Sequence, residues 1–344
     1  MNPLISVIFP CYNSEPFLKY SLESVLNQDY KTLEIICIND GSSDRTLEIL
    51  NEYKKNDNRI IIISNEKNLG LIASLNKALF YVSGEYFARM DADDYSPPER
   101  FSEQIKYLLA NKHIDIVSSG CFSFKKDNQK NHYLPPIARS TKALVFLSIF
   151  ANPFVHGSIF GKSSLIKTGQ FFYDAEYPHA EDFELFSRLA WNNCSVASID
   201  EPLYWLRINF GSVSFKFADV QSATNLKIVK RNLNQFLKID DHIDDVIFKI
   251  LINRIDENVN RKDISKAFQL LNIYYKVVDE KIRFSDIDRR EIEQYLSLHK
   301  LNIILQSNKF RFSKLKFKNL LFFISSLFML NHKQVYLLIK KVLK

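Results

Sequence analysis

Short apolar runs alternate with stretches of helical period through the first hundred residues of the chain. The apolar runs predict strands that are buried on both faces of a sheet. The amphipathic stretches between them predict helices that pack on that sheet. This order indicates an α/β fold with a mainly parallel sheet and helices on both faces. The predicted strands are residues 5–9, 33–38, 59–63 and 85–90.

Polar and acidic residues follow each of these four strands. Right-handed crossovers bring the carboxyl ends of parallel strands to one edge, and ligands of such sheets bind at that edge. We therefore predict one binding site that collects residues from four separate places in the chain. These residues are Pro10, Tyr12 and Asn13, then Asp40, then Asn65 and Asn68, and finally Asp91, Asp93 and Asp94.

The remainder of the chain has a different character in its two parts. The pattern from about Phe101 onward is mixed, whereas the last third reads as successive helices. The predicted elements are helices at 98–111, near 142–150 and from Glu181 onward, a strand at 115–119, and a loop and strand at 152–160. We place a domain boundary near residue 215, between a first region at 1–214, whose character changes near residue 101, and a helical, basic region at 215–344.

The excess positive charge is concentrated at the end of the chain. The net charge is +7, and residues 301–344 contain many Lys and Arg but no Asp or Glu. Basic side chains beside a thick apolar complement, as in Lys309–Lys344, are typical of segments that lie in a membrane interface. We expect a peripheral contact with an anionic membrane, although a helical bundle with a solvated basic face explains the same pattern. Nucleic acid is not expected as a partner, because no recognisable binding module is present.

Other features are typical of a cytoplasmic protein. The chain begins without a basic segment or a long apolar export signal. Its longest late apolar run, 320–330, is shorter than the roughly 20 residues that span a bilayer. The four cysteines lie far apart and form no Cys-x-x-Cys pair, as is usual for reduced thiols. We expect a cytoplasmic location at the inner face of the cell membrane.

Three carboxylates within four positions, Asp91, Asp93 and Asp94, repel one another unless a cation lies between them. Mn²⁺ and Mg²⁺ prefer oxygen ligands, and Mg²⁺ usually takes one or two protein carboxylates together with substrate phosphates. A solvated acidic turn before a helix is the alternative interpretation. The position at a strand end, among three other polar strand ends, favours the metal. No glycine-rich phosphate loop follows the first strand, which excludes the P-loop and most dinucleotide-binding folds.

Several ordered motifs resemble the family 2 glycosyltransferases of the GT-A fold. These motifs are SVIFPCYNSEPFLKYSLESVLNQDY, EIICINDGSSDRTLEIL, SGEYFARMDADD, NPFVHGSIF, EDFELFSRL and YWLRINFGSVS, all within residues 3–214. The resemblance implies an inverting transferase, dependent on Mn²⁺ or Mg²⁺, that uses a nucleotide diphosphate sugar, usually a UDP-sugar. It also implies a glycan or lipid-linked acceptor in surface polysaccharide or lipopolysaccharide biosynthesis.

The same resemblance implies a catalytic domain at 1–214, with a nucleotide-binding half at 1–100 and an acceptor half at 101–214, and it assigns the donor site. It implies that Asp40 contacts the nucleotide base, that Asp93 binds the metal ion, and that Asp91 contacts the ribose or the sugar. A carboxylate accepts a hydrogen bond from the uracil N–H, so the assignment of Asp40 is chemically sensible. The full set of predicted nucleotide-sugar contacts is Pro10, Tyr12, Asn13, Glu15, Asp40, Asn68, Arg89, Asp91, Ala92, Asp94 and Arg207. For Arg89, a strand arginine that faces solvent is the alternative.

Asp182 matches the position of the general base in that family. In this role it takes the proton from the acceptor hydroxyl as that oxygen attacks the anomeric carbon. Glu181 and Asp182 are alternatively plain acidic residues in the first turn of a helix. His156 is assigned to the metal or the diphosphate, although a loop histidine bonded to backbone explains it equally well. Arg207 is expected to bind the diphosphate, with a structural surface arginine as the alternative.

Two other functions stay open from the sequence. Nucleotidyl transfer to a sugar phosphate shares the α/β layout, but it needs a glycine-rich, basic first loop that FPCYNSE does not provide. A catalytically silent scaffold or binding subunit of a glycan-assembly complex is compatible with the same fold. The intact set of Asp40, Asp91, Asp93 and Asp182 argues against the scaffold.

Overall fold

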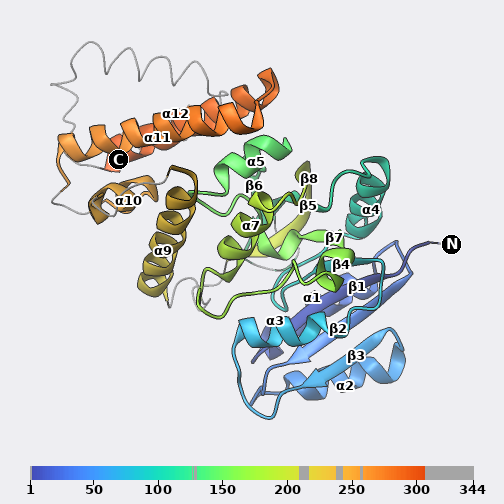
Figure 1. The fold of residues 1–344 in the computed structure, drawn as a ribbon. Helices are drawn as coiled ribbons and strands as arrows, with labels where there is room; N and C mark the ends of the chain where they lie inside the picture. Colours follow the sequence, from blue (N-terminus) through green and yellow to red (C-terminus); the bar gives the residue numbers. More distant parts are fainter. Residues whose placement is uncertain are drawn as a thin grey trace. The chain divides into compact units, whose positions relative to one another are not determined.

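The structure of the protein is a computed structural model that describes residues 2–125, 127, 130–208, 217–237, 243–255 and 259–306. The chain forms two units, whose helices and strands are shown in Figure 1. The first unit consists of Met1–Ser148 and Asn152–Gln221, and the second consists of Ile149–Ala151 and Ser222–Lys344. The basic segment Lys309–Lys344, for which we predict a membrane contact, lies outside the described residues.

The first half of the first unit alternates between strands and helices (Figure 1). Its elements are β1 (Ile5–Cys11), α1 (Glu15–Leu26), β2 (Leu33–Asn39), α2 (Thr46–Asn56), β3 (Ile60–Ser64), α3 (Leu71–Leu79) and β4 (Tyr86–Arg89). β1 pairs in parallel with β2 and with β4, and β2 pairs in parallel with β3. The predicted parallel order is confirmed, and each of the four predicted strands coincides with an observed one.

Helices cover both faces of this parallel sheet. The chain moves outward from β1 to β3 through α1 and α2, and right-handed crossovers place both helices on one face, where they contact each other. α3 then carries the chain back to β4 and contacts β1 and β2 from the other face. The direction of travel therefore reverses between β1 and β4, and ligands of such sheets bind where the carboxyl ends of two such strands part.

Antiparallel pairs extend the sheet in the second half of the first unit. Its elements are α4 (Arg100–Ala110), β5 (Ile116–Phe124), β6 (Lys130–Leu134), α5 (Thr141–Leu147), the 3₁₀ turn η1 (His156–Ser158), β7 (Phe160–Lys162), α6 (Ser164–Lys167), α7 (Glu181–Trp191) and β8 (Val196–Arg207). β7 joins β4 to β5 by antiparallel pairing on both sides, and β6 is antiparallel to β5. β8 runs parallel to β5, which completes an eight-stranded sheet.

The sequence pattern did not reveal β6 or β8. β8 contains the polar sequence Asp200-Glu201-Pro202 at its centre, which interrupts the apolar pattern, and its register against β5 shifts at that point. The strand predicted at 115–119 continues to Phe124, and the helix predicted near 142–150 ends at Leu147. The omission of β8 matters, because this strand supports the site described below.

Alternate residues of β1 show how the sheet buries its faces. Ile5, Val7 and Phe9 are fully buried and belong to one apolar cluster with Leu18 and Leu22 of α1. Burying a side chain of this kind stabilises the fold by about 1.5–3 kcal/mol. The sheet therefore fixes the strand ends, and with them the loops that carry polar residues.

The second unit is helical in the part of it that the structure describes. α9 (Ala218–Leu237) begins at the end of the first unit, and α10 (Asp245–Leu251), α11 (Arg261–Ile282) and α12 (Asp286–Gln306) follow. α11 begins with a capping box, in which the side chains of Asn260 and Asp263 each accept a backbone hydrogen bond. No helix among the described residues is sufficiently long and apolar to cross a membrane.

Candidate active site

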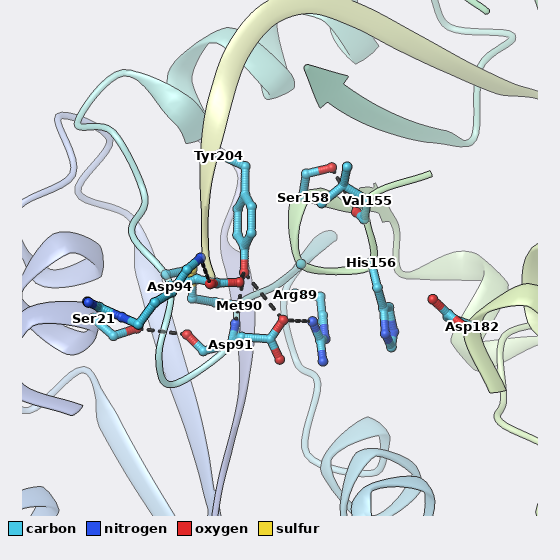
Figure 2. A network of polar contacts seen from close by, with 12 residues as sticks. Ser21, Arg89, Met90, Asp91, Asp94, Val155, His156, Ser158, Asp182 and Tyr204 are labelled. Carbon is cyan, nitrogen blue, oxygen red and sulfur yellow. Dashed lines mark hydrogen bonds and ion pairs between the residues drawn. The ribbon is translucent and has the colours of Figure 1, made fainter. Parts of the chain in front are cut away.

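The acidic segment Asp91–Asp94 follows β4 after one residue, Met90, and Figure 2 shows the side chains of Asp91 and Asp94. The Asp91 carboxylate forms an ion pair with the Arg89 guanidinium and stays partly exposed. Ser21 on α1 donates a hydrogen bond from Oγ to the Asp91 carbonyl oxygen at 2.7 Å. The segment is therefore tied to its own strand and to α1, as expected for a rim that binds a ligand.

Asp94 and Arg207 lie on the inner side of this segment. Asp94 is only 1% exposed, and its oxygens accept hydrogen bonds from the Tyr204 hydroxyl at 2.5 Å and from the Arg207 backbone N–H at 2.7 Å. Arg207 is also buried, and its guanidinium donates to the Asp93 carbonyl and pairs with Asp127, both at 2.6 Å. Both residues were expected to contact the donor, whereas here their side chains bind the protein itself.

The Asp93 carboxylate lies in surroundings that disfavour its negative charge, and a bound divalent cation would stabilise that charge. The residue is half-buried, and burial together with the charge of Asp91 raises the pKa of its carboxyl to about 6. A cation offsets both negative charges, and the oxygen donors suit Mn²⁺ or Mg²⁺. Among the described residues no three His, Cys, Asp or Glu side chains are grouped to hold a metal ion. An ion at Asp93 therefore needs oxygens from a diphosphate and from water, which is common for Mg²⁺.

The Asp40 carboxylate is bound by the loop between β3 and α3. Oδ1 accepts hydrogen bonds from Asn65 Nδ2 at 2.8 Å and from the Leu69 backbone N–H at 2.9 Å, and Oδ2 accepts from the Gly70 backbone N–H at 2.9 Å. Asp40 is 4% exposed, whereas Asn68 in the same loop is exposed. Asp40 therefore joins the second and third strand ends at the rim, where the nucleotide base was expected.

The loops after β1 and β2 bind each other through side chains that were expected to contact the donor. Asn13 Oδ1 accepts from the Ser43 backbone N–H at 2.9 Å, and Glu15 Oε2 accepts from the Arg45 backbone N–H at 3.1 Å. Tyr12, in contrast, is 50% exposed beside them. Pro10 is half-buried at the end of β1, and Ala92 is buried within the acidic segment. This part of the rim is thus held together by hydrogen bonds within the protein itself.

Asp182 lies in the first turn of α7 with both carboxylate oxygens engaged. Asn152 Nδ2 donates to Oδ2, and the Phe183 backbone N–H donates to Oδ1, both at 2.7 Å. Burial and the charge of Asp182 raise the pKa of the neighbouring Glu181 to about 7, and the charge of Asp91 adds to this rise. Asp91, Arg89, His156 and Asp182 follow one another in Figure 2, so the acidic segment and the start of α7 face one common site.

Arg89 lies between these two groups of carboxylates (Figure 2). It is 4% exposed, and its Nε has no hydrogen-bond partner within the described part of the protein. Burial raises the pKa of Asp93, Glu181 and Asp182, and the positive charge of Arg89 opposes that rise in each case. Arg89 is therefore the cation shared by the predicted donor and base residues.

His156 follows Arg89 in the direction of Asp182 (Figure 2). Its Nε2 forms a hydrogen bond with the Tyr173 hydroxyl at 2.8 Å. Burial, helped by the positive charge of Arg89, lowers the pKa of the imidazole well below its usual range, so the ring is neutral. The predicted metal ligand thus already has a side-chain partner at one nitrogen.

Three residues of this region, Arg100, Asn152 and Tyr173, were not singled out from the sequence. Arg100 donates to the Arg89 carbonyl just before the acidic segment, while Asn152 and Tyr173 contact the predicted base and histidine. Of the three, only Asn152 gave a signal, through its position in the motif NPFVHGSIF. Tyr204, which with Trp205 is a candidate for an acceptor platform or else a buried aromatic, is fully buried and donates to Asp94.

The parallel sheet with its reversal between β1 and β4, and the carboxylates at that edge, define a GT-A-type fold. The family model "Glycosyl transferase family 2" matches residues 6–169. An uncharacterized glycosyltransferase of Haemophilus influenzae is 32% identical over 310 residues, which cover 88% of each chain. The putative glycosyltransferase EpsE of Bacillus subtilis is 32% identical over 60% of this chain and 73% of its own length. The chain belongs to glycosyltransferase family 2.

Solved structures share the fold at low sequence identity. TarS 1–349 of S. aureus, in complex with UDP-GlcNAc, has a TM-score of 0.57 and 18% identity, and the match covers 88% of this chain and 90% of TarS. The mannosyltransferase PcManGT of Pyrobaculum calidifontis, in complex with GDP-Man and Mn²⁺, has a TM-score of 0.52 and 16% identity over 90% and 88% of the two chains. The predicted fold class, including the helical region at the end, is thereby confirmed.

Proposed function

We propose that the protein transfers a sugar from a UDP-sugar to a glycan or lipid-linked acceptor, with inversion at the anomeric carbon. The observation that supports this most is the position of the buried Arg89 between Asp91, after β4, and Asp182, at the start of α7 (Figure 2). These groups come from the two halves of the first unit. One half would bind the donor and the other would bind the acceptor, as in a transferase with two substrates.

Asp182 is proposed as the general base. Its two carboxylate oxygens are oriented by Asn152 and by the backbone of Phe183, which fixes the direction of their remaining lone pairs. In that role Asp182 takes the proton of the acceptor hydroxyl while the hydroxyl oxygen forms its bond to the anomeric carbon and the bond to the diphosphate breaks. A single displacement of this kind inverts the configuration, so an α-linked donor gives a β-linked product.

Asp93 is proposed to hold Mn²⁺ or Mg²⁺ together with the donor diphosphate. The donor set fits such an ion, since the Asp93 carboxylate is half-buried and lies beside the negative charge of Asp91. When bound, the ion supplies charge neutralisation to the leaving diphosphate. Arg89 provides a further fixed positive charge between the donor and base carboxylates. The remaining proposed donor contacts are the exposed Tyr12 and Asn68 and the partly exposed Asp91. Asp40 is proposed to contact the nucleotide base.

The cellular setting is a proposal based on the family and on the charge of the chain. We propose residues 1–214 as the catalytic domain, and residues 215–344 as a helical region whose basic end contacts the inner face of an anionic membrane. A lipid-linked acceptor of surface polysaccharide synthesis would be reached at that face. The TarS structure contains UDP-GlcNAc, and the PcManGT structure contains GDP-Man and Mn²⁺. UDP-sugars and GDP-sugars with Mn²⁺ are therefore the first donors to test.

The decisive experiment measures nucleotide release from a panel of UDP-sugars and GDP-sugars by the full-length protein. We expect UDP release from at least one UDP-sugar with Mn²⁺ present, and its loss when EDTA is added. Release of GDP alone would reassign the donor. If no nucleotide sugar is bound or hydrolysed, the chain is better described as a silent scaffold of a glycan-assembly complex.

A further inference from the structure

The acidic segment is bound by β8, a strand that lies more than a hundred residues further along the chain. Tyr95 and Trp205 exchange backbone hydrogen bonds at 3.0 and 2.9 Å, which extends β8 along the segment. Arg207 adds a backbone bond to Asp94 and a side-chain bond to the Asp93 carbonyl. Contacts with a strand that is distant in sequence therefore help to set the conformation of the segment.

One hydroxyl connects the two ends of the segment. The Tyr204 Oη accepts a hydrogen bond from the Asp91 backbone N–H at 3.3 Å and donates one to Asp94 Oδ2 at 2.5 Å. Tyr204 is fully buried and Asp94 nearly so, which leaves no water to replace either partner. A buried polar group that loses its hydrogen-bond partner costs the free energy of its desolvation. The hydrogen bond between Tyr204 and Asp94 therefore favours the one backbone conformation of the segment that allows it.

The Tyr204 ring is itself fixed from two sides. The Arg100 guanidinium lies over it, 5.0 Å from the ring centre, and donates to the carbonyl oxygens of Arg89 at 2.8 Å and Gly157 at 2.9 Å. A Cβ added at Gly157 would lie 2.0 Å from the Tyr204 hydroxyl oxygen, so only glycine allows η1 to close over it. The hydroxyl therefore has one position, and that position is transmitted to Asp91 and Asp94.

We propose that the Tyr204 hydroxyl is a positioning group that holds Asp91 and Asp93 in their donor-binding arrangement, and that Asp94 acts as its buried partner. Asp94 then serves the donor through the backbone of the segment and does not touch the donor. This inference deepens the proposed function, on which it rests for the identity of the ligand. The order of the segment before any ligand binds is independent of that identity, and it is tested separately.

The first test uses hydrogen–deuterium exchange of the full-length protein without ligand. Tyr204→Phe retains the ring and removes only the hydroxyl, so we expect exchange of the amides at 91–94 to accelerate about tenfold. Tyr274→Phe is the matched control, because Tyr274 is fully buried on α11 in the second unit. Unchanged exchange at 91–94 in Tyr204→Phe would overturn the proposal.

The second test measures binding of UDP in the presence of Mn²⁺ by calorimetry. Asp94→Asn can still accept from the Arg207 backbone and hydrogen-bond to Tyr204, so we expect its affinity to stay within about threefold of the unmodified protein. Asp94→Ala and Tyr204→Phe should each lose about tenfold in affinity. Equal loss in Asp94→Asn and Asp94→Ala would show a charged ligand role and overturn the inference.

The two tests separate failure of the inference from failure of the proposed function. If the unmodified protein does not bind UDP with Mn²⁺, the donor assignment fails, and the exchange measurement still decides whether Tyr204 orders the segment. If Tyr204→Phe does not fold, exchange at 91–94 in Asp94→Ala against Asp94→Asn replaces it. Faster exchange in Asp94→Ala alone is expected, and equal exchange in both would contradict the proposal.

Discussion

Asn152 donates a hydrogen bond from Nδ2 to Oδ2 of Asp182 at 2.7 Å. The amide of Asn152 is itself oriented, because its Oδ1 accepts from the Phe154 backbone N–H at 3.0 Å. The loop between α5 and η1 thus fixes the rotamer of a carboxylate at the start of α7. A general base whose carboxylate is held in this way is already oriented for proton transfer.

Asn152→Ala should lower the turnover number about tenfold with little change in the KM for the donor. The substitution leaves Asp182 in place but removes one of the two groups that orient its carboxylate, so the effect falls on proton transfer and not on donor binding. Steady-state rates at saturating and limiting donor separate the two constants. Asn56→Ala, at an exposed position near the end of α2, is the control. A tenfold rise in the KM for the donor with unchanged turnover would contradict this role.

Asp182→Asn should retain donor binding and lose sugar transfer. The amide has nearly the same shape but cannot take a proton, and general base catalysis typically contributes 10²–10⁴-fold. Calorimetry with UDP and Mn²⁺ measures binding, and product formation measures transfer. Simultaneous loss of binding and transfer would place Asp182 in the donor site and require another base.

Asp93→Ala should nearly abolish the Mn²⁺-dependent part of UDP binding. Asp93 is the proposed metal ligand, and among the described residues no three His, Cys, Asp or Glu side chains are grouped to hold the ion elsewhere. The affinity for UDP is measured with Mn²⁺ and with EDTA, and the difference should vanish in the variant. Asp200→Ala, which removes an exposed carboxylate paired with Arg139, should leave this difference intact.

Glu181 should make the stability of the protein depend on pH. Burial and the charge of Asp182 raise its pKa from 4.5 to about 7, with Asp91 adding to the rise and Arg89 opposing it. A raised pKa means that the folded state binds the proton more tightly, so this contribution is fully present below about pH 4.5 and is lost as the pH rises through 7. In Glu181→Gln the decrease in melting temperature between pH 5 and pH 8 should therefore be smaller. An equal decrease in both proteins would show that Glu181 ionises normally.

The strands and the acidic cluster were predictable from the sequence, whereas the supports of that cluster were not. β1 and β4 carry mainly apolar runs, and Asp91 and Asp93 come within four residues of the end of β4, so local pattern and topology suffice. Asp94 belongs to the same acidic cluster, yet its side chain binds the Tyr204 hydroxyl of β8. Arg207 likewise binds the Asp93 carbonyl and Asp127. Such a pairing depends on the register of β8, which the polar residues at its centre conceal.

The loops after β1 and β2 are joined by Asp44, and its removal should destabilise both helix starts. Asp44 Oδ2 accepts from the Glu15 backbone N–H and Oδ1 from the Thr46 backbone N–H, each at 3.0 Å, so one carboxylate caps α1 and α2. Although burial opposes the effect, hydrogen bonds from Thr46 and Glu15 lower the pKa of Asp44. Its contribution is therefore present above about pH 4 and is lost at lower pH.

Asp44→Ala should lower the free energy of unfolding by about 1–2 kcal/mol at pH 7, which is the usual cost of a lost N-cap. Urea titration measures this change, and Glu48→Ala is the control, because Glu48 pairs with Arg45 at the exposed surface of α2. Surface pairs of that kind contribute little. Equal midpoints for Asp44→Ala and Glu48→Ala would mean that water replaces the shared cap. In that case the rim around Asn13 and Glu15 would not be fixed before the donor binds.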